Sequence, residues 1–463
     1  MAETSRPVCP NGRYSTGRSP HWSVSGGVRK LTLVSPQGPR VVRRAPFSEN
    51  PRVGTRGHRT HQRILDAALE VFGDEGYHGG SVDRIAQLGG CSRVSFYQYF
   101  ASKEDLLRQL AAQVVRELSA STEALDPLSP DAEGWDAMRV WVGRYAEIYA
   151  RYEPVFNVYQ TAARSADVLA VDALRTGEQM VARIEAHMMA PTLPRRPRDP
   201  VIRLALECLA HVLDIGGILR SVTPRAYPSE RVEVAITDVL HRTFFGVRSD
   251  VNVHPPAGPP PPALELDATS ERLQQDDHQA SVPSRSGNGA LDALLASGRD
   301  VFVRRGYHNT RVDDLVAAAG VSHGAFYRYF RNKGEFARLL TARATRVVAG
   351  TLLEFPDLFA PDASSELRVW LGRYNAVEAN EAAMLRVWVD GALQDPALRA
   401  QSAPPLDWGR RRLAHCLHPR AFGDDEIDGV VLVALLGVFG ARQRPAAEID
   451  AAAHIIERGL LGR

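Results

Sequence analysis

The sequence predicts an all-α protein built from two tandem units, and three observations predict it. The segment 92–103 recurs in altered form at 322–333, at a constant offset of 230 residues. Apolar residues follow the helical period through both halves, while no stretch shows the alternation of a half-buried strand. Two copies of one helical architecture are therefore expected in a single chain.

The repeat extends beyond that segment. Between residues 72 and 103, 13 of 32 positions are identical to the residue 230 positions later, among them Phe72, Gly76, Val82, Phe96 and Lys103. A second identity, between 139–145 and 368–374, has an offset of 229. The duplication therefore covers whole units and not only their first helices.

Composition limits the class of protein. The chain has 463 residues, of which 44% are hydrophobic and 24% charged, as in soluble globular proteins of about three domains. Its four cysteines lie far apart and form no metal-ligand or disulfide pattern, so neither a metal nor a cofactor is indicated. The apolar run 430–439 is about half of a membrane span, and the N-terminus lacks the apolar region of a signal peptide. These features predict a cytoplasmic protein without a membrane partner.

Positive charge is concentrated in the first residues. Residues 1–63 contain 12 Lys and Arg against 2 Asp and Glu, which leaves 44 against 52 for the rest of the chain. The segment 1–56 has no sustained periodicity and is expected to be a disordered basic extension. It is either a solvated, even misassigned, segment or an arm that neutralises DNA phosphates.

The first module follows as four predicted helices. One apolar stripe runs from Ile64 to Phe72, a second short helix opens near Ser81, and a third begins after the Gly89-Gly90 turn with Ser92 as its N-cap. A fourth helix begins at Ser102. Two short helices separated by a glycine turn and supported by a preceding helix predict a helix-turn-helix at 57–104, with its copy at 288–335.

The residues of both modules resemble one family. Gly76-Tyr77-His78, Val82-Asp83, Gly90-Cys91-Ser92 and Phe96-Tyr97-Gln98-Tyr99-Phe100 are similar to the DNA-binding domain of the tetracycline-repressor (TetR) family of bacterial transcription regulators, as are Gly306-Tyr307, Ala319-Gly320-Val321-Ser322 and Phe326-Tyr327. The modules depart from the pattern at Gly89, at Gly334 and at Gly298, which would cost a helix about 1 kcal/mol relative to Ala. The second module is therefore expected to be the less stable or the weaker DNA binder.

The second helix of a helix-turn-helix lies in the major groove. Its first residues are the base-facing candidates, namely Arg93, Val94 and Ser95 in the first module and His323, Gly324 and Ala325 in the second. Arg93 could bind a guanine and Val94 a thymine methyl group. The resemblance implies that the remaining DNA-contact or scaffold positions are Ser81, Ser92, Tyr97, Tyr99, Lys103, Thr310, Ser322, Tyr327, Tyr329 and Lys333. Phe72, Phe96 and Phe100 are expected to form the module core.

Further helices follow each module. Residues 105–248 show helical patterns at 106–118, 135–149, 155–169, 174–189, 201–219 and 232–245, with prolines such as Pro154 between them. Residues 336–463 repeat this organisation. The proline-rich stretch 249–287 is expected to be a linker, which does not dictate how the halves pack.

The resemblance also implies the role of these helical domains, which would bind a small effector and dimerise through their last two helices. Those are 201–219 with 232–245 and 427–439 with 446–461, so the two halves could pair within one chain. The aromatic candidates for an effector pocket are Trp141, Tyr145, Tyr149, Phe156, Trp370 and Tyr374. The alternative is that they are ordinary core residues.

The sequence therefore predicts a DNA-binding transcription regulator, by family a repressor, whose partners are a double-stranded operator and an unknown small effector. It would act as a covalent pseudo-dimer or a higher assembly whose halves read unlike half-sites. One alternative is a homodimer that binds DNA through the first module only, with the second unit regulatory. Two weaker hypotheses are a nonspecific DNA-binding protein and an enzyme. The chain lacks the common catalytic motifs, which argues against an enzyme.

Overall fold

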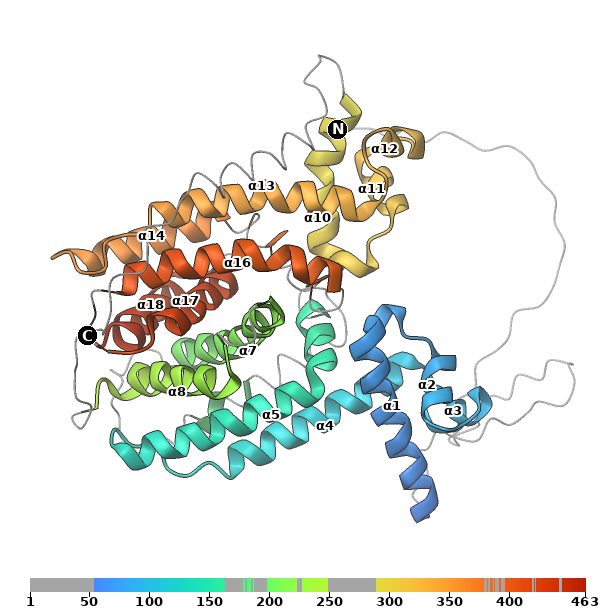
Figure 1. The fold of residues 1–463 in the computed structure, drawn as a ribbon, viewed down its shortest axis with the longest axis horizontal. Coiled ribbons are helices and arrows are strands. Elements are labelled where there is room, and N and C mark those ends of the chain that lie inside the picture. The colour runs from blue at the N-terminus through green and yellow to red at the C-terminus, as the bar shows by residue number, and fades with distance from the viewer. Residues whose placement is uncertain are drawn as a thin grey trace, which may run out of the picture. The chain divides into compact units, whose positions relative to one another are not determined.

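The structure is a computed structural model that describes residues 54–162, 178–179, 181–184, 186, 198–222, 227–248, 289–378, 381, 384–385, 387, 391–392, 396–418, 420, 422–440 and 444–463. Helices are the regular elements of this part of the chain, which contains no strand, so the all-α prediction is confirmed (Figure 1). The predictions for the basic extension and the linker fall outside the described residues, apart from 54–56 of the extension. Within the described ranges, no helix is both long and apolar enough to cross a bilayer.

The first module consists of α1 (Thr55–Gly79), α2 (Val82–Leu88), α3 (Arg93–Tyr99) and the start of α4 (Lys103–Glu123). Gly76 breaks α1 with a φ of 70°, and Gly90 turns the chain between α2 and α3 with a φ of 65°. Glycine adopts these angles without the clash that a Cβ atom would cause. The predicted helix-turn-helix is therefore present, with its turn at Gly90.

The second module repeats this arrangement in α10 (Gly289–Asn309), α11 (Val312–Ala319), α12 (His323–Tyr329) and α13 (Lys333–Leu353) (Figure 1). Gly306 and Gly320 have φ values of 73° and 64°, at the positions equivalent to Gly76 and Gly90. Both modules thus keep the same backbone breaks at the offset of 230.

Aromatic side chains form the core of each module. Phe72, Phe96 and Phe100 are buried in the first, as predicted, and Phe302 and Phe326 are buried in the second. Burial of such side chains stabilises by roughly 1.5–3 kcal/mol each relative to exposure. These residues hold the short helices α3 and α12 in place.

Behind the first module, α5 (Ala132–Ala162), α7 (Arg198–Val222) and α8 (Ser229–Phe245) follow α4. The predicted boundary at Pro154 appears as a kink inside α5, where two helical segments meet at Tyr152 in a non-helical conformation (φ −112°, ψ 19°), two residues before the proline. Proline bends a helix because it lacks an N–H and its ring clashes with the preceding turn. The predicted helix 155–169 is described as far as residue 162, where it forms the end of α5, and the one at 174–189 only at 178–179, 181–184 and 186.

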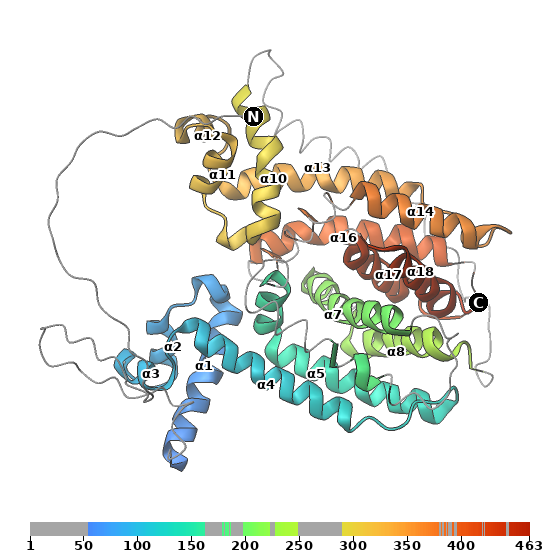
Figure 2. The ribbon, with the colours of Figure 1, turned by 180° about the vertical axis from the view of Figure 1, so that it is seen from behind.

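The second half continues in α14 (Ala363–Glu378), α16 (Pro396–Leu417), α17 (Asp425–Gly440), α18 (Ala446–His454) and the π-helix η2 (Ile455–Leu460). Its helices pack directly on those of the first half. α7 packs against α16, α17 and α18, while α8 packs against α17 and η2 (Figures 1 and 2). Because nearly all of α17 is buried, this packing forms one apolar interior that both halves share.

Charged groups cross the same packing surface. Asp428 of α17 is fully buried, and its Oδ2 lies 2.7 Å from Nη1 of Arg420 and 3.8 Å from Nη2 of Arg242 on α8. Arg242 also donates from Nε to the carbonyl of Gly459 at 2.7 Å. Burial raises the pKa of the Asp428 carboxyl, and the two guanidinium groups oppose that rise. The first half thus contributes a buried cation to a carboxylate of the second.

Candidate nucleic-acid interface

The two recognition helices, α3 and α12, begin in the same way. The hydroxyl oxygen of Ser92 accepts a hydrogen bond from the N–H of Ser95 at 3.1 Å, and that of Ser322 accepts from the N–H of Ala325 at 3.2 Å. Such caps satisfy N–H groups that have no partner within the helix. The two serines therefore fix where each recognition helix starts.

Each recognition helix is anchored by one buried phenylalanine, Phe96 or Phe326. Most of its other side chains face outward, and 73% of Val94, 42% of Tyr97 and 55% of Tyr327 is exposed. Two of these groups lie on α3, and α12 carries one at the position equivalent to Tyr97. The exposed faces of α3 and α12 are therefore the candidate DNA-reading surfaces.

The first residue of each recognition helix contacts an aspartate of the preceding helix. Nη1 of Arg93 lies 2.6 Å from Oδ2 of Asp83, and Nε2 of His323 lies 2.6 Å from Oδ1 of Asp313. The Asp83 carboxylate raises the pKa of Arg93, and the guanidinium carbon lies 5.9 Å from the centre of the Tyr97 ring. A guanidinium has five N–H donors, so this contact leaves others for a base or a phosphate.

The two aspartates were not among the predicted site residues. They occur at the offset of 230, like the modules themselves. That recurrence is the sequence signal that could have found them. Their positions orient the two base-facing side chains.

Ser81 and Thr310 were both predicted as DNA-contact or scaffold positions, but the structure places their side chains differently. The Ser81 hydroxyl caps α2 by accepting from the N–H of Arg84 at 3.2 Å. Thr310 is fully buried and donates its hydroxyl to the carbonyl of Gly306 at 2.7 Å, so its side chain has no surface for a phosphate. The residue equivalent to Ser81 is Arg311, which is exposed. The prediction of Thr310 as a DNA contact is corrected accordingly.

Lys103 and Lys333 hold the loop that precedes the helix-turn-helix. Nζ of Lys103 donates to the carbonyls of Tyr77 at 2.7 Å and Gly80 at 3.0 Å, and Nζ of Lys333 donates to those of Tyr307 and Thr310, both at 2.9 Å. Burial lowers the pKa of both ammonium groups. These contacts give the lysines a scaffold role, and phosphate contact by them stays a prediction.

Tyr99 and Tyr329 are half-buried at the ends of the recognition helices. The ring of Tyr99 lies 6.3 Å from that of His61, and the ring of Tyr329 lies 6.3 Å from that of Phe330. Both tyrosines thus combine contacts to the module with an exposed edge. Gly324 is exposed on α12 and adds no side chain to its surface.

The six aromatic candidates for an effector pocket lie in the helical domains. Trp141, Tyr145 and Tyr149 are buried, and Phe156 packs on Tyr149 at 4.7 Å between ring centres. Trp370 and Tyr374 stack at 5.0 Å and are also buried. In this conformation they serve as core residues, and their role toward an effector stays a prediction.

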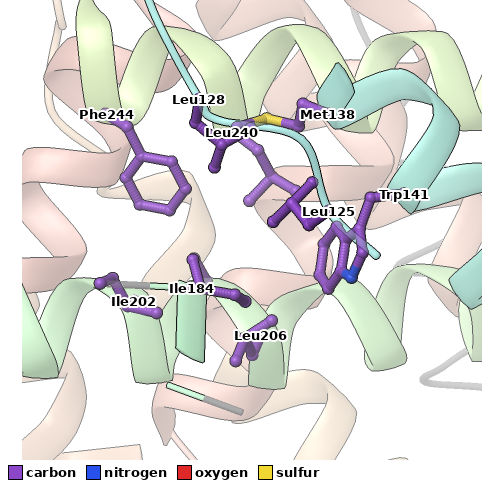
Figure 3. Close-up of a pocket in the computed structure, with 10 residues that line it drawn as sticks. Leu125, Leu128, Met138, Trp141, Ile184, Ile202, Leu206, Leu240 and Phe244 are labelled. Carbon is purple, nitrogen blue, oxygen red and sulfur yellow. The ribbon is translucent and has the colours of Figure 1, made fainter. Parts of the chain in front are cut away.

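A small apolar cavity lies beside Trp141. Figure 3 shows its lining, which includes Leu125, Met138, Ile202 and Phe244. Its volume is about 10 Å³, roughly the minimum that a single water molecule needs. A ligand would enter this site only if the surrounding helices moved apart.

Comparisons with known proteins agree with this geometry. The family model "Bacterial regulatory proteins, tetR family" matches residues 64–110 and again residues 294–340. These two matches cover the helix-turn-helix of each half. The chain therefore carries the same recognised domain twice.

Three curated proteins illustrate the similarity. The fatty acid metabolism regulator protein of Bacillus subtilis is 42% identical over 50 residues, which are 11% of this chain and 26% of that protein. The HTH-type transcriptional regulator RutR of Escherichia coli is 40% identical over 70 residues, 14% of this chain and 33% of RutR. The HTH-type transcriptional repressor AcnR of Corynebacterium glutamicum is 31% identical over 111 residues, 22% of this chain and 57% of AcnR. The chain thus spans between about a quarter and somewhat over half of the length of these relatives.

Proposed function

We propose that this chain, which matches the model of the tetR family of bacterial regulatory proteins once in each half, is a sequence-specific, DNA-binding transcription regulator that acts as a covalent pseudo-dimer. Its domains would be the helix-turn-helix units at 57–104 and 288–335 and the regulatory units at 105–248 and 336–463. The observation that carries the proposal is the pair of exposed recognition helices, α3 and α12, on one chain whose helical halves pack on each other.

The packing between the halves supports an intrachain pair. α7 and α8 contact α17, α18 and η2, and the buried Asp428, which is 2.7 Å from Arg420 of its own half, also lies 3.8 Å from Arg242 of the first half. An unpaired buried charge is costly, so this contact favours the partner that supplies the opposite charge. In this structure the oppositely charged group belongs to the other half of the same chain.

The two reading surfaces support unlike half-sites. Arg93, Val94 and Ser95 offer a cation, a methyl-bearing surface and a hydroxyl, whereas His323, Gly324 and Ala325 offer a smaller and less charged set. Side chains of different donor pattern and size bind different base edges in the major groove. The operator would therefore be asymmetric.

Regulation would follow from ligand binding in the helical domains. The chain would be a repressor, as the name of AcnR states for that relative, and a small effector would separate the helices around the apolar cavity. Because the cavity is nearly closed in this conformation, an effector that binds only the opened state would shift the population toward it. The spacing of the two recognition helices would change with that shift.

The test is selection of bound DNA by the full-length protein, followed by affinity measurements at fixed salt on the recovered site. We expect a site with two unlike halves. Arg93→Ala should cost about 1–3 kcal/mol and relax specificity in one half, and His323→Ala should weaken the other half by a smaller amount. Arg108→Ala, which removes an exposed cation outside the reading surface, is the matched control.

A palindromic site that is weakened by Arg93→Ala alone would contradict the proposal. That result would mean that two chains bind through their first modules and that the second unit is regulatory. Equal affinity for the selected site and for random DNA would instead indicate a nonspecific binder.

A further inference from the structure

One face that both modules share carries charge of opposite sign in the two copies. This face is formed by the end of the first helix and by the helix that follows it, that is, by α1 and α2 or by α10 and α11. At equivalent positions, Asp74 and Glu75 of the first module are replaced by Arg304 and Arg305 in the second. All four side chains are exposed. The duplicated surface is therefore acidic in one copy and basic in the other.

The reversal includes the ion pair between the two helices of this face. In the first module Nε of Arg84 lies 3.5 Å from Oε1 of Glu75, and in the second Nη1 of Arg305 lies 2.7 Å from Oδ1 of Asp314. Residues 84 and 314 are equivalent, as are 75 and 305. The ion pair between the two helices is therefore kept in both modules, with the positions of its cation and carboxylate exchanged.

The shape of this face also differs between the copies. In the second module it contains a groove of about 220 Å³ whose lining comprises Val301, Arg304, Arg305, Asp314, Ala317 and Ala318. In the first module the residue equivalent to Ala318 is Leu88, a large apolar side chain that is 38% exposed. One copy thus presents an apolar side chain beside acidic groups, and the other a groove beside basic groups.

We propose that these two faces bind each other between neighbouring copies of the chain, with Leu88, Asp74 and Glu75 of one copy against the groove at Arg304 and Arg305 of the next. Complementary charge favours this partner and disfavours contact between two like faces. Both faces are exposed within the chain, so a second copy can reach them. Since the contact joins different surfaces, it is head-to-tail and leaves one free face of each kind on a pair of chains.

This inference rests on the proposed function, because the contact would form between chains that are bound to DNA. The face involves few residues of a small module, and interfaces of this size are weak between free proteins. Two chains on neighbouring operators would be held at a high effective concentration, where a weak contact becomes effective. The structure therefore predicts cooperative occupancy of tandem sites and no stable dimer in solution.

The test compares binding of the full-length protein to a probe with one selected site and to probes with two sites at varied spacing. The wild-type protein should fill the second site roughly tenfold more tightly than the first at a preferred spacing. Asp74→Arg and Arg304→Asp should each abolish most of that gain, because they place like charges together. The double variant should restore it, since residue 74 of one chain then meets residue 304 of the next with reversed charge.

Glu147→Arg is the matched control, because it makes the same charge change at an exposed position on α5 and should keep the cooperativity. Affinity for the single-site probe should be similar for all variants, which also shows that they fold. Independent filling at every spacing, or a double variant no better than the single ones, would overturn the inference. So would loss of single-site affinity in Arg304→Asp with unchanged cooperativity, which would make Arg304 a phosphate contact. Failure of the wild-type protein on the single-site probe would overturn the proposed function, and this inference with it.

Discussion

At the scale of the residue, the contact between the first and fourth helices of a module uses different pairs of side chains in the two copies. In the second module Gly298 lies against the ring of Phe336, where an added Cβ would meet ring atoms at 2.4 Å. The equivalent residues of the first module are Ala68 and Leu106, both fully buried. A larger side chain on α13 is thus matched by a smaller one on α10.

Gly298→Ala should therefore destabilise the second module by about 1–3 kcal/mol through overpacking, although alanine is the better helix former. Gly298→Ala combined with Phe336→Leu should recover most of the loss, because it recreates the pair of the first module. Denaturant unfolding would measure both. Gly372→Ala, at a helical glycine with nothing within 4 Å of the added Cβ, is the control and should stabilise slightly. A neutral Gly298→Ala would show that the ring moves aside freely.

The sequence identifies this glycine but not its partner. The sequence alone shows that Gly298 lowers the helix propensity of its segment. The space that it leaves for Phe336 depends instead on how α10 and α13 cross. Thr310 shows the same limit, since its burial follows from the Gly306 break and not from its residue type. The recognition helices were predictable because their caps, turn glycines and buried phenylalanines act locally.

At the scale of the element, the helix boundary predicted at Pro154 corresponds to a kink inside α5. Pro154 was expected to separate two helical stretches, and in α5 two helical segments meet at Tyr152, whose φ and ψ are non-helical. Tyr149, Tyr152 and Val155 are buried on both sides of the bend. Packing on neighbouring helices therefore keeps the two segments together across the kink, and single-sequence patterns do not contain that packing.

The contact between α18 and α8 contains a titratable group. Nε2 of His454 donates to the carbonyl of Thr243 at 3.1 Å, and burial, with a smaller contribution from Arg458, lowers the pKa of His454 below its ordinary value of 6.5. The unfolded chain then binds this proton more tightly than the folded one. The stability contribution of neutral His454 is thus complete above pH 6.5 and is lost as the pH falls below it.

The free energy of unfolding should therefore decrease between pH 7.5 and pH 5.5, and His454→Gln should make this decrease shallower. Gln keeps a donor for the Thr243 carbonyl but does not titrate. Denaturant unfolding at several pH values checks this. His415→Gln, the same change at an exposed histidine on α16, is the control and should keep the slope of the wild type. An unchanged slope in His454→Gln would contradict the assignment.

At the scale of the whole molecule, the two halves share a core that contains charges. The offset of 230 predicts the duplication, but it cannot predict that Arg242 and Asp428 meet, because lone charges far apart in sequence carry no pairing signal. Their burial beside Arg420 makes the contact between the halves chemically selective. Apolar helix faces alone would pair with less discrimination.

Asp428→Ala should destabilise the protein by about 3–5 kcal/mol, because it leaves the buried Arg420 and Arg242 with less compensating charge. The loss should appear in unfolding curves as an earlier separation of the halves, together with a larger hydrodynamic radius. Asp450→Ala removes a carboxylate that is 68% exposed and should cost less than about 1 kcal/mol. Equal effects of the two substitutions would show that the buried cluster does not hold the halves together.

The central claim, that one chain supplies both reading helices, is tested most directly by the mass of the complex on a single selected site. Native mass spectrometry with the full-length protein and a probe that carries one site should give one chain per duplex. Loss of either module's reading surface should then weaken that one-to-one complex. Two chains on one minimal site would contradict the account, since each would then bind with one module and leave the other off the DNA.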